Sequence, residues 1–371
     1  MLRAAAHLLV LFALVAQLPL LGAWLLGYPL EGYREVLPRL GRVRHAPFAW
    51  PAFLGLALLI LLCVAPLVRR FLRGAPDDSP SATQAEPALP EPGRFPWWGW
   101  AGLALGALSW VVAWTPWPAL APLREHTFTP LWVAYITVAN ALVARRRGRC
   151  LFAEPRAWAL VPLSAVFWWF FEYLNRFVEN WDYHGPEFQD GWDLLLHGTL
   201  PFATVLPAVA STQDLLATYP RLTAPFRDAW RWRCPWPRAA ALLVLLLASA
   251  GLAGLAWAPN ALFPLPWFAP LFILLALQVL AGERPPLLRD VAAGDWRAPV
   301  TFALAALICG AFWEMWNSLS LARWTYRVPY VQAFHIFEMP LLGYAGYPPF
   351  GLECAAVSAL VGFQGRRWFA P

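Results

Sequence analysis

Apolar runs long enough to cross a lipid bilayer recur along nearly the whole chain. A bilayer core about 30 Å thick requires about 20 apolar residues in a helix. The 371 residues are 60% hydrophobic and 13% charged, a composition that excludes an ordinary soluble domain. The sequence predicts an all-α, polytopic transmembrane helical bundle of about ten spans, in which prolines interrupt the sixth and the tenth. The candidate spans are residues 4–27, 51–68, 97–114, 128–144, 157–177, 193–217, 239–257, 266–281, 299–320 and 334–363.

The basic side chains set the expected orientation in the membrane. All 28 of them are arginines, and most fall on one side when the ten spans alternate in direction. Arginines beside a span mark its cytoplasmic end. We therefore predict a multi-pass protein of the bacterial inner membrane with both termini cytoplasmic. Four arginines that follow the first span oppose this assignment, so an inverted first hairpin is an alternative. They are Arg34, Arg39, Arg42 and Arg44.

Composition divides the chain into five parts. Residues 1–73 form a two-span hairpin, and residues 74–96 are rich in Pro, Ser and acidic residues, which predicts a disordered cytoplasmic linker. Residues 97–217 and 239–371 each contain four of the candidate spans. The basic loop 218–238 joins these two parts and interleaves arginine with tryptophan. Beside two spans, such a loop indicates contact with anionic lipid and not with nucleic acid.

The two four-span parts contain matching residues in the same order, which predicts an internal repeat. Four spans in each copy give both copies the same orientation. We therefore predict a tandem parallel repeat related by a pseudo-two-fold axis along the bilayer normal. The matches are Trp114-x-Pro116 with Trp257-x-Pro259, Pro130-Leu131 with Pro270-Leu271, Glu172-x-x-Asn175 with Glu314-x-x-Asn317, Trp181-x-Tyr183 with Trp324-x-Tyr326, and Leu200-Pro201 with Met339-Pro340.

Carboxyl and amide groups inside apolar spans are the strongest candidates for a functional site. Ionisable groups in a span are costly unless they are paired or hydrated, so they face the protein interior or a wet cavity. Positions i and i+3 share a helix face, so Glu172 and Asn175 project together, as do Glu314 and Asn317. We predict an outward-facing intramembrane site in which the glutamates are catalytic acid and base and the asparagines bind substrate. The alternative is that these side chains only bond neighbouring helices.

The tenth candidate span adds two further candidates beside its proline breaks. Glu338 is a candidate third catalytic group, and His335 is a candidate substrate-binding residue. The aromatic residues after each Glu and Asn pair form either an interfacial belt or a wall that binds an apolar polyene. They are Trp181, Tyr183, Trp324 and Tyr326. The histidine and carboxylate spacings match no metal motif, and no glycine loop for phosphate is present, so we expect no metal and no cofactor.

The order of these elements resembles that of the small membrane lycopene cyclases and carotenoid hydratases of bacteria and archaea. The shared pattern is a span that ends in Glu, then Trp-x-Tyr, then a span with proline, and it covers the second half of each repeat. The resemblance implies a multi-span enzyme that protonates or hydrates a polyene without a soluble cofactor. The cyclases' Pro-x-Glu-Glu motif is absent, because Glu338 here precedes Pro340. No catalytic residue is therefore carried over from that family.

These observations predict an integral membrane protein that performs carboxylate acid–base chemistry on a lipid or isoprenoid. Its expected partners are the bilayer and an apolar or lipidic small molecule. Two alternatives use the same residues. One is a proton-coupled transporter of a small or lipidic substrate, and the other is a membrane scaffold or assembly protein.

Overall fold

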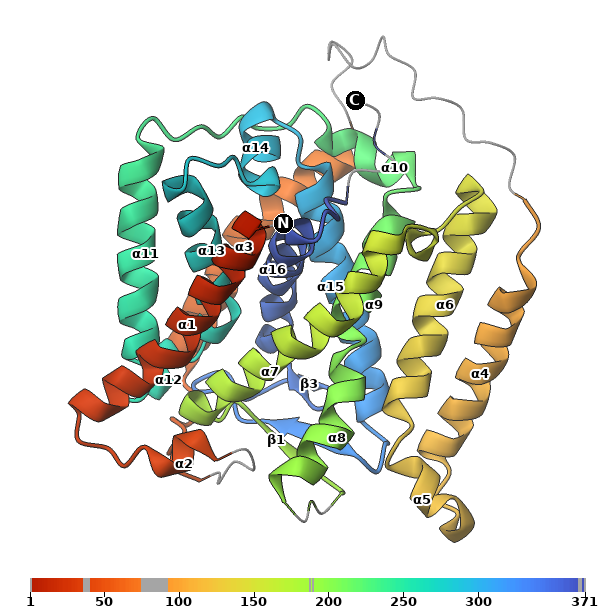
Figure 1. Cartoon of the computed structure of the whole chain (residues 1–371), viewed down its shortest axis with the longest axis horizontal. Helices are drawn as coiled ribbons and strands as arrows, with labels where there is room; N and C mark the ends of the chain where they lie inside the picture. The colour runs from red at the N-terminus through yellow and green to blue at the C-terminus, as the bar shows by residue number, and fades with distance from the viewer. Residues whose placement is uncertain are drawn as a thin grey trace.

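Long apolar helices make up most of this computed structural model, which describes residues 2–35, 41–74, 93–186, 188, 190–365 and 369 (Figure 1). Most of the predicted linker, residues 75–92, lies outside the described residues. The predominantly helical class that the sequence predicts is confirmed, since the described strands are four short segments.

The N-terminal hairpin consists of α1 (Leu2–Leu25) and α3 (Trp50–Arg73), with the single turn α2 (Glu31–Arg34) between them. Helix α1 packs against the bundle, whereas α3 stands almost alone at its edge. The leucines of α3 are consequently exposed, Leu58 by 58% and Leu62 by 64%. A helix that is apolar on all sides and touches little protein is suited to contact with lipid.

The first four-span part begins with α4 (Trp97–Trp114) and ends with a broken helix. Pro201 lies in the last turn of α8, and a short break separates α8 from α9. In chain order its elements are α4, η1 (Pro118–Leu120), α5 (Ala121–Arg124), α6 (Phe128–Arg147), η2 (Leu151–Ala153), η3 (Pro155–Ala159), α7 (Leu160–Val178), β1 (Trp181–His184), α8 (Gly191–Phe202) and α9 (Val205–Leu216). The connection to the second part contains α10 (Pro220–Thr223) and η4 (Ala224–Phe226).

The second four-span part follows a related order. Its elements are α11 (Pro237–Ala253), α12 (Pro259–Leu262), η5 (Leu265–Trp267), α13 (Ala269–Leu280), α14 (Pro286–Ala293), α15 (Arg297–Asn317), β2 (Arg323–Tyr326), β3 (His335–Ile336), β4 (Met339–Pro340), η6 (Leu341–Gly346) and α16 (Tyr347–Leu360). The tenth candidate span is therefore helical only in its later part, because β3, β4 and η6 precede α16. The proline at the end of β4 and those at the start of α16 lack the backbone donors that a continuous helix needs.

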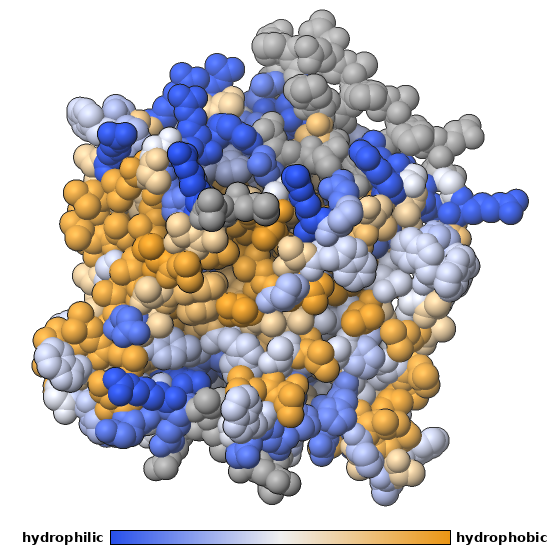
Figure 2. Space-filling model, viewed as in Figure 1, coloured by the Kyte–Doolittle hydropathy of each residue, from blue (hydrophilic) through white to orange (hydrophobic). Residues whose placement is uncertain are grey.

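Five segments of the described chain are long and apolar enough to cross a membrane, and the number rises to seven if each of two bent pairs is one span. The bends are 66° before α6 and 56° before α13. The five segments are Arg3–Leu25, Trp50–Arg73, Pro155–Val178, Gly191–Leu216 and Arg297–Asn317. Hydrophobic residues form a band between hydrophilic ends of the molecule (Figure 2). These apolar helices indicate a membrane protein.

The helices form two outer pairs around a central group. Helix α4 packs against α6, and α11 packs against α13. These pairs lie on opposite sides of the bundle, with α7, α9, α15 and α16 between them (Figure 1). The strands β1 and β3 lie together at one end of the bundle (Figure 1).

Candidate functional site

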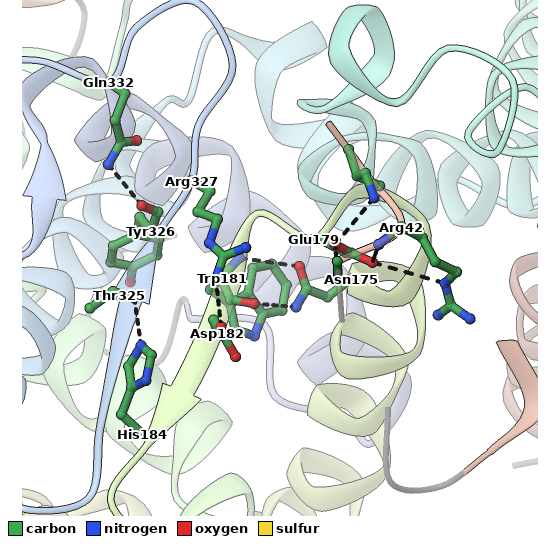
Figure 3. A network of polar contacts seen from close by, with 12 residues as sticks. Arg42, Asn175, Glu179, Trp181, Asp182, His184, Thr325, Tyr326, Arg327 and Gln332 are labelled. Carbon is green, nitrogen blue, oxygen red and sulfur yellow. Dashed lines mark hydrogen bonds and ion pairs between the residues drawn. The ribbon is translucent and has the colours of Figure 1, made fainter. Parts of the chain in front are cut away.

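Strands β1 and β2 pair with each other and so join the two four-span parts at one end of the bundle. The pairing is antiparallel, with Trp181 opposite Tyr326 and Tyr183 opposite Trp324. The Trp of each Trp-x-Tyr motif thus faces the Tyr of the other motif. The pair Asp182 and Thr325 lies at the centre of this arrangement. Each residue of this central pair has one polar contact (Figure 3). Arg327 forms an ion pair with Asp182 at 2.9 Å, and the His184 ring is hydrogen-bonded to the Thr325 hydroxyl at 2.8 Å.

Each predicted asparagine holds one of these strands through backbone bonds. The Asn175 amide donates to the carbonyl of Trp181 at 2.8 Å and accepts from its N–H at 3.3 Å. Asn317 forms the same two bonds with Trp324, both at 2.7 Å. Both asparagines are buried. Each buried amide bonds both the N–H and the carbonyl of one strand residue, as a neighbouring strand would do. Both asparagine side chains therefore hold the sheet in position.

Glu172 receives three aromatic donors. The Tyr183 hydroxyl lies 2.6 Å from its Oε1, the Trp168 Nε1 lies at 2.9 Å and the Trp181 Nε1 at 3.2 Å. Trp168 comes from the preceding turn of α7, whereas the other two come from β1. The sequence predicted Trp181 and Tyr183 as binding residues, and the structure brings both to Glu172. Trp168 was not predicted, although it lies on the same helix face, four residues before the glutamate.

Glu314 is completely buried and has a different set of donors. Its Oε1 accepts from the hydroxyls of Tyr326 at 2.6 Å and Tyr347 at 2.8 Å. Trp324 reaches the glutamate only indirectly, because its Nε1 donates to the Tyr326 hydroxyl at 2.7 Å. The second carboxyl oxygen, Oε2, is buried without a hydrogen-bond partner in the part of the chain that the structure describes. One acceptor position of Glu314 is therefore free.

The difference between the two glutamates is explained by the residue four positions earlier. Trp168 occupies this position before Glu172, and Gly310 occupies it before Glu314. A Cβ built on Gly310 would meet the ring of Tyr347 at 2.4–2.6 Å, so only glycine leaves room for that ring. Tyr347 thus provides from α16 the donor that Trp168 provides within α7. A glycine at position 310 forms no recognisable sequence motif, so the contact between Tyr347 and Glu314 could not be predicted from it.

The remaining predicted residues lie near Glu314 or at the surface. Glu338 lies in the turn between β3 and β4, and its charge acts on Glu314. His335 is exposed and its ring contacts the Gln332 amide at 3.1 Å. Within the described residues, no hydrogen bond or ion pair joins Glu172 to Glu314, so each carboxyl group belongs to its own set of donors.

Desolvation of their hydroxyl groups and the neighbouring carboxylates keep the two strand tyrosines protonated. Burial, followed by the charge of the Glu314 carboxylate, raises the pKa of Tyr326 well above its usual range. The pKa of Tyr183 is raised in the same way by desolvation of its hydroxyl, which contacts Glu172, and by the Glu172 carboxylate, although 40% of the residue is exposed. Both phenols therefore act as hydrogen-bond donors to their glutamates at neutral pH.

A third glutamate, Glu179, was not predicted as part of any site. It ends α7 in the left-handed conformation (φ 50°) and is 2% exposed. Its carboxylate accepts from three successive backbone N–H groups, those of Gly41, Arg42 and Val43, at 2.8, 3.1 and 3.3 Å (Figure 3). Successive backbone N–H groups of this kind bind anions. Glu179 therefore ties the segment before α3 to the end of α7.

The described residues contain no group of three or more His, Cys, Asp or Glu side chains that could hold a metal ion. In this helical protein with apolar, membrane-compatible helices, the carboxyl groups of Glu172 and Glu314 are held by tyrosine and tryptophan donors. Comparison of the chain with protein-family models, with curated proteins and with solved structures found no match.

Proposed function

We propose that the chain crosses the bacterial inner membrane ten times and contains two parallel four-span repeats. Equivalent contacts support the repeat, because the Glu–Tyr bonds of 2.6 Å and the paired Asn–Trp backbone bonds occur in both halves. The two bent pairs before α6 and α13 support it as well. The start of α1 and the end of α16 lie toward the same end of the bundle, which agrees with both termini being cytoplasmic (Figure 1).

Within this architecture, the protein is proposed to be an enzyme that performs acid–base chemistry on a lipid or isoprenoid. The observation that carries the proposal is the free Oε2 of the buried Glu314. A carboxyl group that is fixed through one oxygen and free at the other can deliver or accept a proton at a defined point. Glu314 is thus the proposed acid or base. Glu172 is the second carboxyl group, and Glu338 adjusts the charge near Glu314.

An aromatic cluster supports an apolar substrate for this site. Trp313, next to Glu314 in the sequence, stacks with Tyr347 at 6.1 Å and contacts Trp132 at 4.9 Å between ring centroids. Trp132 also packs against Trp316 at 5.1 Å. Aromatic faces bind apolar chains and stabilise cationic intermediates, which form when a polyene is protonated.

The test compares membrane lipids from cells that contain wild-type protein, Glu314→Gln, Glu172→Gln or no protein, by mass spectrometry. The enzyme proposal expects a covalent lipid product with wild type that is lost with Glu314→Gln, which keeps shape but cannot transfer a proton. Identical lipid profiles in all four samples would oppose the enzyme. If such samples also showed proton-dependent uptake into vesicles, the transporter alternative would replace it.

One observation favours the scaffold alternative. Both asparagines and the Oε1 atoms of both glutamates are used to hold β1 and β2. In a scaffold, Glu314→Gln would weaken folding and would leave membrane lipids and vesicle uptake unchanged. Folding measurements on the purified variants therefore separate this alternative from the enzyme.

A further inference from the structure

A further glutamate, Glu353, is buried within α16. It is 1% exposed, and its Oε2 has no hydrogen-bond partner among the described residues. The side chain lines a cavity of about 20 Å³ together with residues of three other helices. They are Leu11, Phe12 and Val15 of α1, Phe167, Phe170, Phe171 and Leu174 of α7, and Pro270 of α13.

The lining of this cavity restricts what Glu353 can bind. Every other residue that lines it is apolar. Divalent cations such as calcium require six or more oxygen ligands, which one carboxyl group cannot provide. The volume is sufficient for about one water molecule, since a single water needs roughly 10–15 Å³ of such space. A proton is the one cation that fits both the chemistry and the size.

Neighbouring charges do not compensate an ionised Glu353. The titratable groups on the helices packed around it are Tyr347 and Cys354 on α16 itself, Arg297, Cys309 and Glu314 on α15, Asp214 on α9, Arg289 and Asp290 on α14, Glu172, Tyr173 and Arg176 on α7, and Arg3 and His7 on α1. In the described part of the chain, none of these forms a hydrogen bond or ion pair with Glu353, and no arginine lines the cavity. An unpaired carboxylate in an apolar interior is very costly, so the group takes up a proton instead.

We propose that Glu353 is a proton-binding site inside the bundle that is reached through the cavity between α1 and α7. The site is separate from Glu172 and Glu314. If the proposal for Glu353 fails, the proposed enzyme is unaffected, because the two proposals rest on different side chains and different measurements.

The position of α1 explains how the cavity is covered. Phe12 of α1 stacks on Phe170 of α7 at 4.1 Å, and the Tyr173 hydroxyl donates to the carbonyl of Ala16. Pro19 interrupts the hydrogen bonds of this same helix, because proline has no N–H to give to the residue four positions earlier. The helix that covers the cavity is thus α1. The hydrogen bond from Tyr173 holds it at Ala16, close to the turn that Pro19 weakens.

The infrared difference spectrum between wild type and Glu353→Gln tests the protonation state. At neutral pH we expect loss of the C=O stretching band of a protonated carboxyl group, and this band should shift in D₂O. The control is Glu125→Gln, which removes an exposed glutamate and should remove carboxylate bands instead. Loss of carboxylate bands from Glu353→Gln would overturn the proposal. If the Gln variant does not fold, Glu353→Asp replaces it in the test. This variant should shift the band of the protonated carboxyl group without removing it, and a shift of carboxylate bands would overturn the proposal.

Access through the cavity is tested on the unmodified protein with dicyclohexylcarbodiimide, an apolar reagent that reacts with protonated carboxyl groups. Peptide mass spectrometry should find the adduct on Glu353 and not on Glu125. Labelling should decrease after Val15→Trp, which fills the cavity from α1. An unlabelled Glu353 would overturn the access route, and labelling that Val15→Trp does not change would do so as well.

Discussion

Gly310 lies directly against the ring of Tyr347, where a Cβ would come within 2.4 Å of the Cε2 atom of that ring. This contact allows the Tyr347 hydroxyl to reach Glu314 at 2.8 Å. In the other half of the chain, Trp168 fills the corresponding position and donates to Glu172 itself. The two halves thus hold Glu172 and Glu314 by different means, and of these two glutamates Glu314 keeps a buried oxygen without a hydrogen-bond partner among the described residues.

Gly310→Ala is expected to displace Tyr347 and break its bond to Glu314. The added methyl group overpacks a buried contact, which typically costs 1–3 kcal/mol, about the loss expected here in the free energy of unfolding. Unfolding of the purified protein in mixed detergent micelles measures it. Gly55→Ala is the matched control, because no heavy atom lies within 4 Å of its added Cβ. In a Tyr347→Ala background the cost of Gly310→Ala should nearly vanish, and an undiminished cost would contradict this account.

Tyr326 makes the stability of the protein depend on alkaline pH. Its folded-state pKa is raised well above the ordinary value of 10.0 by burial and by the Glu314 carboxylate. The folded protein then holds the phenolic proton more tightly than the unfolded chain. The resulting stabilisation is complete below pH 10.0 and is lost as the pH rises through that value toward the folded-state pKa.

The corresponding measurement is the free energy of unfolding of wild type and Tyr326→Phe at a series of pH values. Wild type should lose stability above pH 10.0 more steeply than the variant. Tyr28→Phe, which changes a tyrosine that is 41% exposed, should keep the wild-type slope. Parallel curves for wild type and Tyr326→Phe would show that this phenol does not contribute.

A disulfide can test the register of β1 and β2. Asp182 and Thr325 are Cα partners, and directly opposed strand residues lie within the range that a disulfide spans. Asp182→Cys with Thr325→Cys should therefore cross-link on mild oxidation, in a background where the exposed Cys63 and Cys234 are replaced by Ala. Peptide mass spectrometry identifies the link. Asp182→Cys with Arg323→Cys is off register and should link more slowly, and equal rates would contradict the pairing.

Glu179 is expected to order the segment that precedes α3. Glu179→Gly retains the left-handed backbone of φ 50° but removes the acceptor of three N–H groups. We expect a loss of about 1–3 kcal/mol and faster hydrogen exchange at Gly41, Arg42 and Val43. Glu179→Gln, which keeps one acceptor oxygen, should give an intermediate effect. Unchanged exchange in Glu179→Gly would mean that other contacts hold this segment.

The helices could be predicted from the sequence because hydrophobicity is a local property. The segment 97–114 coincides with α4, and each of the ten candidate segments overlaps a helix of the structure. The first part of the tenth was different, since β3, β4 and η6 depend on proline and on contacts with other elements. The ten membrane crossings and the repeat stay predictions.

The partners of the site could be predicted only in part. Spacing on a helix placed Glu172 with Asn175, and the Trp-x-Tyr motifs indicated aromatic neighbours. Contacts between distant segments left no such pattern. Tyr347 reaches Glu314 across 33 residues, and Gly41 reaches Glu179 across 138 residues. The prediction that the two glutamates act as acid and base of one site stays a prediction, and their hydrogen bonds are formed with separate donors.

The pairing of β1 with β2 also bears on the origin of the chain. Each strand has its partner in the opposite half, and the same motif faces itself in antiparallel register. Given the proposed duplication, an ancestral chain with a single four-span unit would have paired this strand with the strand of a second copy of itself. Such self-complementary pairing is the hallmark of a two-fold symmetric homodimer. On that proposal, fusion of the two copies would have allowed each half to diverge, which accounts for the difference between Gly310 and Trp168.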